Sequence, residues 1–209
     1  MFGVTDLKRF SRDLLYRSQF GITEKECESG IIAACAFFGI PMPRMIEDLT
    51  YSPGGGTMFK NWDPNTYADD VLCYDLVQLK HLGVNNYTGF TAVFTHECAH
   101  RYFQNRFLPG PNFGQWEKEL VADYFMGVRA ALERQDITTI IDALAKNSTG
   151  SGTHPIGKLR QDYVIYGKQE GYYHIIHAQP FNIEEYFQRF LEYRINHLEE
   201  LRRAEFKVY

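Results

Sequence analysis

The sequence His96-Glu97-Cys98-Ala99-His100 constrains the local fold more than any other part of this 209-residue chain. On an α-helix, two histidines four residues apart lie one above the other on the same face. They can therefore present two imidazole nitrogens to one metal ion. Glu97 follows the first histidine by about 100° around the helix and can reach a water molecule on that metal. Two neutral imidazoles and an open coordination position suit Zn²⁺, and a carboxylate in this place suits a general base.

The flanking residues predict that this pentapeptide lies on a helix over 88–107. Apolar side chains recur there at helical spacing, and they comprise Ala92, Val93, Cys98, Ala99, Tyr102 and Phe103. Thr88 or Asn86 is the expected N-cap, and a Pro-Gly-Pro turn at 109–111 ends the helix. Histidines on such a helix can also be ordinary core or rim residues. A third ligand argues against that alternative, because catalytic zinc usually takes three protein ligands and a water.

The next predicted helix, over 115–134, supplies acidic candidates for the third ligand. Glu119 and Asp123 lie four residues apart within its apolar face, where an unpaired charge is costly. Glu119 is the predicted third ligand of one zinc ion, and Asp123 is predicted to accept the spare N–H of a metal-bound histidine. Glu117 is the rival third ligand, and we prefer Glu119 because Asp123 follows it by one helical turn. The remaining alternative is a solvated face on which these acids pair with nearby basic residues.

These two motifs together resemble a known family pattern. The pentapeptide at 96–100 followed by Glu119-Leu120-Val121-Ala122-Asp123 is similar to the gluzincin pattern, HExxH followed by ExxxD. Within gluzincins the chain most resembles the M48 family, which includes HtpX-type and CAAX-prenyl proteases and their small soluble relatives. That family has an HPxxxxR segment after the third ligand, and His154 and Arg160 match its spacing. The resemblance spans residues 70–165. The membrane helices of the family are not found, because the most apolar run, 31–40, is too short to span a bilayer.

The resemblance also implies roles around the scissile bond. In the family the histidine of the HPxxxxR segment lies near the scissile carbonyl, which makes His154 the predicted donor to the developing oxyanion. Arg160 is predicted to bind substrate or to hold the His154 segment in place, and Tyr163 and Tyr166 on the next helix are reserve donors. Gluzincins hold extended peptide by β-addition to an edge strand before the metal-binding helix. Residues 70–75 are assigned that role.

The expected fold class is α+β and zincin-like, predominantly helical, with a small mixed β-sheet whose edge strand borders the active-site helix. Apolar periodicity and turn residues predict further helices over 5–20, 24–38, 156–169 and 183–206, and strands over 44–50, 56–62 and 70–75. Thr23 with Glu26 is expected to cap the second helix. The glycine run 54–56 lacks the ending of a phosphate loop and is interpreted as a turn, and residues 147–153 as a polar loop.

Length and composition favour one domain over 1–209, with N-terminal helices in 1–43, a catalytic core in 44–165 and a C-terminal helical segment in 166–209. A net charge of −4 gives no general footprint for binding nucleic acid. No signal-peptide core or transmembrane segment is recognised, so a cytoplasmic location is expected. The four cysteines form no CxxC pair and are expected to be reduced and partly buried. The oligomeric state is not predicted.

Together these features predict a zinc metalloendopeptidase that acts on protein or peptide substrates. One Zn²⁺ ion is held by His96, His100 and Glu119, and Glu97 acts as the general base. Two alternatives stay open. A zinc-stabilised module could bind peptide without cutting it, although such a module has no need of Glu97. A latent protease could hold its own N-terminal or C-terminal segment in the cleft.

Overall fold

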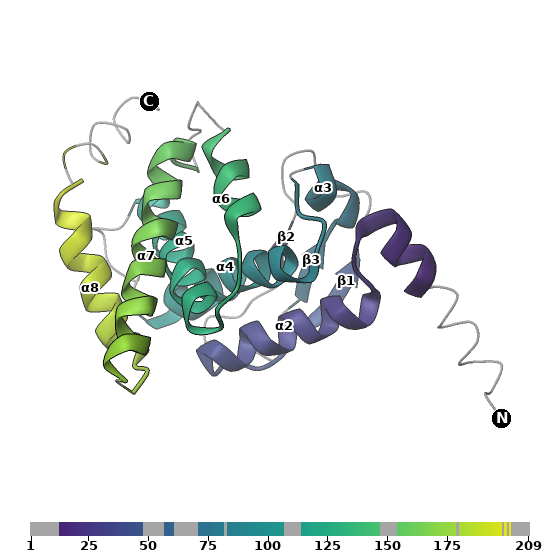
Figure 1. The fold of residues 1–209 in the computed structure, drawn as a ribbon, viewed down its shortest axis with the longest axis horizontal. Helices are drawn as coiled ribbons and strands as arrows, with labels where there is room; N and C mark the ends of the chain where they lie inside the picture. Colours follow the sequence, from purple (N-terminus) through teal and green to yellow (C-terminus); the bar gives the residue numbers. More distant parts are fainter. Residues whose placement is uncertain are drawn as a thin grey trace. The chain divides into compact units, whose positions relative to one another are not determined.

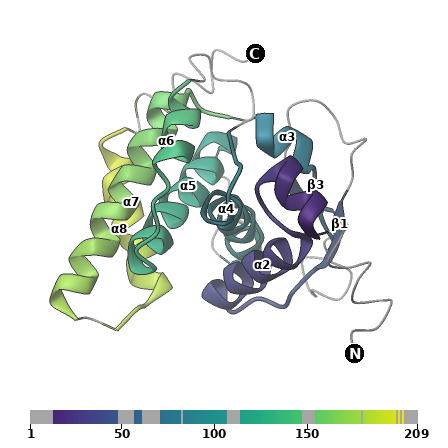
Figure 2. The ribbon, with the colours of Figure 1, turned by 45° about the vertical axis from the view of Figure 1, so that its right-hand side comes forward.

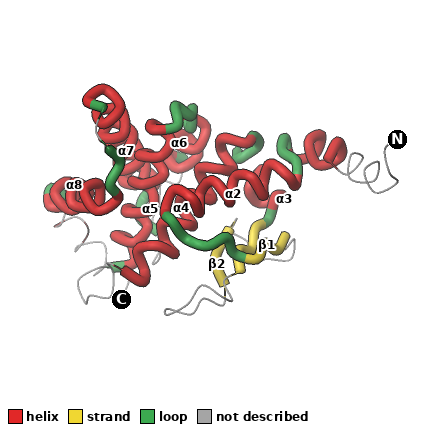
Figure 3. Tube along the Cα trace, turned by 90° about the horizontal axis from the view of Figure 1, so that it is seen from below, coloured by secondary structure: helices red, strands yellow, loops and turns green. Residues whose placement is uncertain are grey.

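The structure is a computed structural model and describes residues 13–47, 57–60, 71–81, 83–106, 114–146, 154–178, 180–197, 199 and 201 (Figure 1). The chain divides into two compact units, Met1–Phe94 and Thr95–Tyr209. The boundary falls inside helix α4, Tyr87–Arg106, and coincides with neither boundary of the predicted three-part division. Helices make up most of the described chain, beside one small sheet (Figure 3). The predominantly helical α+β class is therefore confirmed.

The N-terminal unit begins with helical residues 13–20, and α2 follows over Glu24–Phe38. The hydroxyl of Thr23 accepts the Glu26 N–H at 3.2 Å, and the Glu26 carboxylate accepts the Thr23 N–H at 2.8 Å. The predicted capping box is therefore confirmed. Gly39 ends α2 in the left-handed conformation, with φ at +63°, which a glycine adopts without strain.

Three strands form one mixed sheet in this unit, namely β1 Arg44–Glu47, β2 Thr57–Lys60 and β3 Val71–Tyr74. The strand order is β1-β3-β2, with β1 parallel and β2 antiparallel to β3. All four residues of β3 are buried. The ring of Tyr74 packs edge-on against that of Phe94 on α4, with the centroids 6.2 Å apart. The strand beside α4 is therefore β3.

A small mixed sheet was predicted, and it is found, but the edge position predicted for residues 70–75 is wrong. β3 has hydrogen-bonded neighbours on both sides and offers no free edge for β-addition. The unbroken apolar run of β3 is typical of a strand buried on both faces, whereas a half-exposed edge strand alternates apolar and polar residues. The sequence pattern pointed to the centre of the sheet, and the family resemblance pointed to its edge.

Side chains cap the N-termini of the next two helices, α3 and α4. Asp75 Oδ1 accepts the Val77 N–H at 2.8 Å and so caps α3, Leu76–His81, a short helix that was not predicted. Asn86 Oδ1 accepts the Gly89 N–H at 2.8 Å. Of the two N-caps predicted for α4, Asn86 is therefore the one observed.

In the described part of the C-terminal unit, α4 is followed by α5 Gln115–Leu132, α6 Thr138–Ala145, α7 Gly157–His177 and α8 Ile183–Ile195. Helix α7 lies alongside α5 and α6 in both views (Figures 1 and 2). The ring of Phe103 on α4 lies 4.8 Å from that of Phe125 on α5 and 5.0 Å from that of Phe187 on α8. This aromatic core joins the C-terminal part of α4 to α5 and α8.

Glycines allow α5 and α7 to approach closely. A Cβ atom added at Gly167 would lie 2.0 Å from the Tyr124 carbonyl oxygen, and one added at Gly127 would lie 2.1 Å from the Val164 carbonyl oxygen. The two backbones are therefore in direct contact at this crossing. The contact fixes the middle of α7 against the middle of α5, one to two turns after the predicted third ligand, Glu119.

In this unit, several predicted helix ranges differ from the helices of the structure. Helix α6 was not predicted, and α7 continues to His177 rather than 169. The helix predicted over 183–206 is interrupted where α8 ends at Ile195, and residues 202–206 lie outside the described residues. The predicted turn at 54–56 and polar loop at 147–153 lie outside the described residues. All four cysteines are buried and lie outside disulfide bonds. Within the described ranges, no helix has the length and apolar character needed to cross a membrane.

Candidate metal centre

Two imidazole rings converge on one side of α4. Nε2 of His96 lies 3.0 Å from Nε2 of His100, one helical turn later. The rings meet edge to face, with centroids 4.6 Å apart. The sequence spacing therefore produces the predicted pair of nitrogens on one face of the helix.

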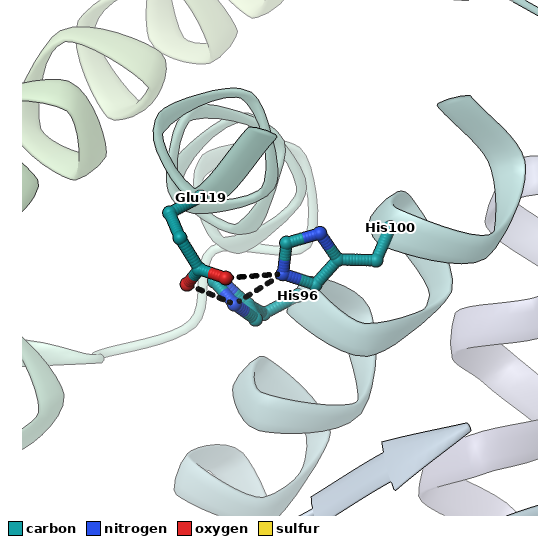
Figure 4. A group of neighbouring side chains, drawn as sticks. All are labelled: His96, His100 and Glu119. Carbon is teal, nitrogen blue, oxygen red and sulfur yellow. Dashed lines mark hydrogen bonds and ion pairs between the residues drawn. The ribbon is translucent and has the colours of Figure 1, made fainter. Parts of the chain in front are cut away.

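Helix α5 brings the carboxylate of Glu119 to this pair (Figure 4). Oε2 of Glu119 lies 3.4 Å from Nε2 of His96, and Oε1 lies 3.2 Å from Nε2 of His100. The three side chains are 11%, 20% and 13% exposed, in the order His96, His100, Glu119. Each can offer one ligand atom to a common metal ion.

The geometry of this cluster fits a tetrahedral zinc site. With zinc-ligand bonds of about 2.0–2.2 Å, neighbouring ligand atoms of a tetrahedron lie roughly 3.3–3.6 Å apart. The two nitrogens lie 3.0 Å apart, and each lies 3.2–3.4 Å from a different oxygen of the Glu119 carboxylate, which is close to that range. Oε2 of Glu119 is buried and receives no hydrogen bond from the described part of the chain. The charge of this oxygen is partly compensated by Arg160, whose Nη2 lies 3.6 Å away, and a metal ion would compensate it directly.

Glu117, the rival third ligand, is engaged elsewhere. Its Oε2 accepts the Gly114 N–H at 2.7 Å, which caps α5, and its Oε1 pairs with Nε of Arg194 on α8. Its side chain is 6% exposed and so is not part of a solvated face. Between the two candidates, the geometry places Glu119 at the histidines.

Asp123 lies directly behind the histidine pair. Its Oδ1 is 2.9 Å from Nδ1 of His96, and its side chain is fully buried. The guanidinium of Arg160 donates from Nε to Oδ2 at 2.7 Å and from Nη2 to Oδ1 at 2.8 Å. The solvated acidic face that the sequence left open is therefore not observed, since both α5 acids that face α4 are largely buried.

The charges on His96, Asp123 and Glu119 depend on one another. Burial opposes a charge on His96, but the carboxylates of Asp123 and Glu119 outweigh that effect and raise its pKa to about 10. Burial likewise opposes ionisation of Asp123, but Arg160 and His96 hold the pKa of its carboxyl below the usual range. The Glu119 pKa is also lowered, because the two imidazoles outweigh burial. Without metal, a proton on His96 and the charge of Arg160 together balance the two carboxylates.

Glu97 follows His96 on α4 and is partly buried. Burial raises the pKa of its carboxyl above the usual value, and interactions with His96 and His100 oppose this only in part. A raised pKa makes the carboxylate a stronger base. This property suits the general base that the sequence predicts.

The HPxxxxR segment also reaches the cluster. Nε2 of His154 lies 3.5 Å from Oε2 of Glu119, and its side chain is 47% exposed. Nη2 of Arg160 lies 3.6 Å from the same oxygen. Burial lowers the pKa of His154, and Glu119, which acts in the opposite direction, does not offset it. Residues of the HExxH and HPxxxxR motifs therefore meet at one carboxylate oxygen, Oε2 of Glu119, which belongs to the ExxxD motif.

The two reserve tyrosines lie in the packing between α7 and α8. Tyr163 is fully buried, with its ring against Phe190 and its hydroxyl 3.5 Å from Nδ1 of His197. Tyr166 stacks on Tyr193 with the ring centroids 3.9 Å apart. These contacts give no support to either tyrosine as an oxyanion donor.

Sequence reasoning missed the partners of two arginines. Arg160 was predicted to bind substrate or hold its own segment, whereas its bidentate partner is Asp123, 37 residues earlier. Arg194 was given no role, although it pairs with Glu117 across 77 residues. Local periodicity carries no signal for such long-range pairs. A buried acid on a helix with no local cation is the one hint that the sequence offers.

The chain was compared with protein-family models, curated proteins and solved structures, and none of the three comparisons found a match. The site is therefore interpreted from its own geometry and from the order of its motifs.

Proposed function

We propose that the protein is a zinc-dependent endopeptidase of the gluzincin type, which hydrolyses peptide bonds. The observation that carries the proposal is the convergence of His96 Nε2, His100 Nε2 and the Glu119 carboxylate at separations of 3.0–3.4 Å. A base next in sequence to the first ligand completes the set of groups that metallopeptidase chemistry needs. The order of the motifs HExxH, ExxxD and HPxxxxR along the chain supports the proposal that this protein is a relative of the M48 family.

The chain's own residues have separate tasks in this reaction. A zinc ion held by the three ligands would acidify a water molecule and polarise the substrate carbonyl. Glu97 takes a proton from the attacking water as the new C–O bond forms. It passes that proton to the amide nitrogen as the C–N bond breaks, so the products are a carboxylic acid and an amine.

His154 is the proposed donor to the carbonyl oxygen as negative charge develops there. Its lowered pKa leaves the ring neutral at pH 7, with one N–H to donate. Its half-exposed side chain leaves that N–H within reach of a bound peptide. No other proposed role at the site requires a histidine at this position.

A peptide-library digest analysed by mass spectrometry tests the proposal. Wild type with zinc, wild type with chelator, and zinc-loaded Glu97→Gln are compared. We expect cleavage only in the first sample, because the substitution removes the base and keeps all three ligands. Glu97→Gln should retain one zinc per chain by metal analysis.

The outcomes separate the proposed peptidase from a peptide-binding module. Zinc bound at one equivalent with no cleavage of any peptide would reject constitutive peptidase activity and leave the binding module or the latent protease. Full cleavage by Glu97→Gln would reject Glu97 as the base. A wild-type protein that takes up no zinc would reject the metal centre itself.

A further inference from the structure

Arg160 pairs with the carboxylate of Asp123, which is not itself a proposed ligand of metal or substrate. Asp123 is fully buried, so the orientation of its carboxylate depends entirely on protein partners. The two contacts from Arg160, at 2.7 and 2.8 Å, engage both oxygens in a bidentate pair. A bidentate guanidinium fixes the plane of a carboxylate as well as its position.

The same carboxylate touches a predicted metal ligand. Oδ1 of Asp123 lies 2.9 Å from Nδ1 of His96 and 2.8 Å from Nη2 of Arg160. One oxygen atom from α5 therefore joins α4 to α7. The Nη2 atom also lies 3.6 Å from Oε2 of Glu119, so a single guanidinium faces both acids of the centre.

We propose that Arg160 is a positioning residue of the metal centre, which acts through Asp123 on His96. Its planar guanidinium fixes the Asp123 carboxylate, and the carboxylate holds the His96 ring so that Nε2 points toward His100 and Glu119. The inference rests on the proposed metal centre and adds a positioning role to a residue that sequence reasoning linked to substrate or to its own segment. Lysine cannot replace arginine in this role, because an ammonium group is a point charge without a fixed plane.

Zinc affinity of the purified full-length chain, measured by competition with a chromophoric chelator, tests the proposal. Arg160→Met should weaken zinc binding about tenfold, at the low end of the effect of outer-sphere substitutions. Arg160→Lys should recover less than half of that loss on a logarithmic scale. Lys158→Met is the matched control on the same turn of α7, because Lys158 is 69% exposed and pairs with Asp162. Its affinity should equal that of wild type.

Two further measurements make the route through Asp123 testable. The visible absorption spectrum of bound Co²⁺ reports on ligand geometry, and it should change in Arg160→Met but not in Lys158→Met. In an Asp123→Ala background, Arg160→Met should cost no further zinc affinity, because the carboxylate that carries its route is already removed. The double variant also avoids a buried unpaired carboxylate, so it remains informative if Arg160→Met alone does not fold.

Each result bears on a different claim. Unchanged affinity and Co²⁺ spectrum in a folded Arg160→Met would overturn the inference while leaving the metal centre intact. Full recovery by Arg160→Lys would show that charge alone matters and would overturn the orienting role. Additive losses in the double variant would overturn the route through Asp123. A wild-type chain that binds no zinc would overturn the proposed function, and this inference with it.

Discussion

Nδ1 of His96 lies 2.9 Å from Oδ1 of Asp123, while Nε2 of the same ring lies 3.0 Å from Nε2 of His100. A neutral imidazole with its proton on Nδ1 leaves a lone pair on Nε2 for a metal. A carboxylate 2.9 Å from Nδ1 favours this tautomer electrostatically, and its position one turn after Glu119 accounts for the ExxxD spacing in physical terms.

The first prediction distinguishes the two acids of the α5 N-terminus. Glu119→Ala should lower bound zinc well below one equivalent, because it removes the third ligand. Glu117→Gln should keep the zinc and instead lower the free energy of unfolding by about 1–3 kcal/mol, because it weakens the contacts with Gly114 and Arg194. Metal analysis and urea unfolding of the two variants check these results. Loss of zinc in Glu117→Gln with full binding in Glu119→Ala would reverse the ligand assignment.

The second prediction concerns pH in the metal-free protein. The acids around His96 raise its pKa to about 10, above the usual value of roughly 6.5 for an unfolded chain. The protonated ring therefore contributes stability that is fully present below about pH 6.5 and is lost as the pH rises through about 10. Urea unfolding in the presence of chelator should show the free energy of unfolding falling across that interval.

A His96→Phe variant is the control for this pH dependence, because other groups also titrate between neutral and alkaline pH. The difference in unfolding free energy between wild type and this variant should shrink as the pH rises. Zinc should bind more tightly to wild type over the same interval, since binding displaces the proton. A difference that grows with pH would contradict the assignment of the raised pKa to His96.

Residue spacing within single helices predicted most residues of the candidate site. It did not predict the contacts between residues far apart in the sequence. The spacing of His96 and His100 fixes their common face on α4 from helix geometry alone. Glu119 and Asp123 follow from the same rule on α5. The partner of Arg160 depends on how α7 crosses α5, which periodicity within one helix does not determine. The edge position of residues 70–75 failed for a related reason, since strand order is a property of the whole sheet.

The third prediction concerns the crossing that brings Arg160 to Asp123. Gly167→Ala would place a Cβ atom 2.0 Å from the Tyr124 carbonyl oxygen, so α7 must shift away from α5. The free energy of unfolding should fall by roughly 1–3 kcal/mol or more, as for other overpacked sites. Zinc affinity should also fall, because the shift separates Arg160 from Asp123. The exposed Gln169→Ala, two residues later on α7, is the matched control and should change neither quantity. Lost stability with wild-type zinc affinity would show that the crossing does not position the metal centre.

The fourth prediction separates catalysis from metal binding at His154. Its Nε2 lies 3.5 Å from Oε2 of Glu119, beyond a strong hydrogen bond, so His154→Phe should leave zinc affinity nearly unchanged. The value of kcat should fall about 100-fold, as expected when one donor to an oxyanion is removed. His177→Phe, at the exposed end of α7, is the control and should keep the wild-type kcat. Steady-state kinetics test this prediction on a peptide found in the library digest. The zinc content of each variant is measured in parallel. A wild-type kcat in zinc-loaded His154→Phe would exclude His154 as the oxyanion donor, and an equal fall in zinc content would instead make it part of the metal-binding shell.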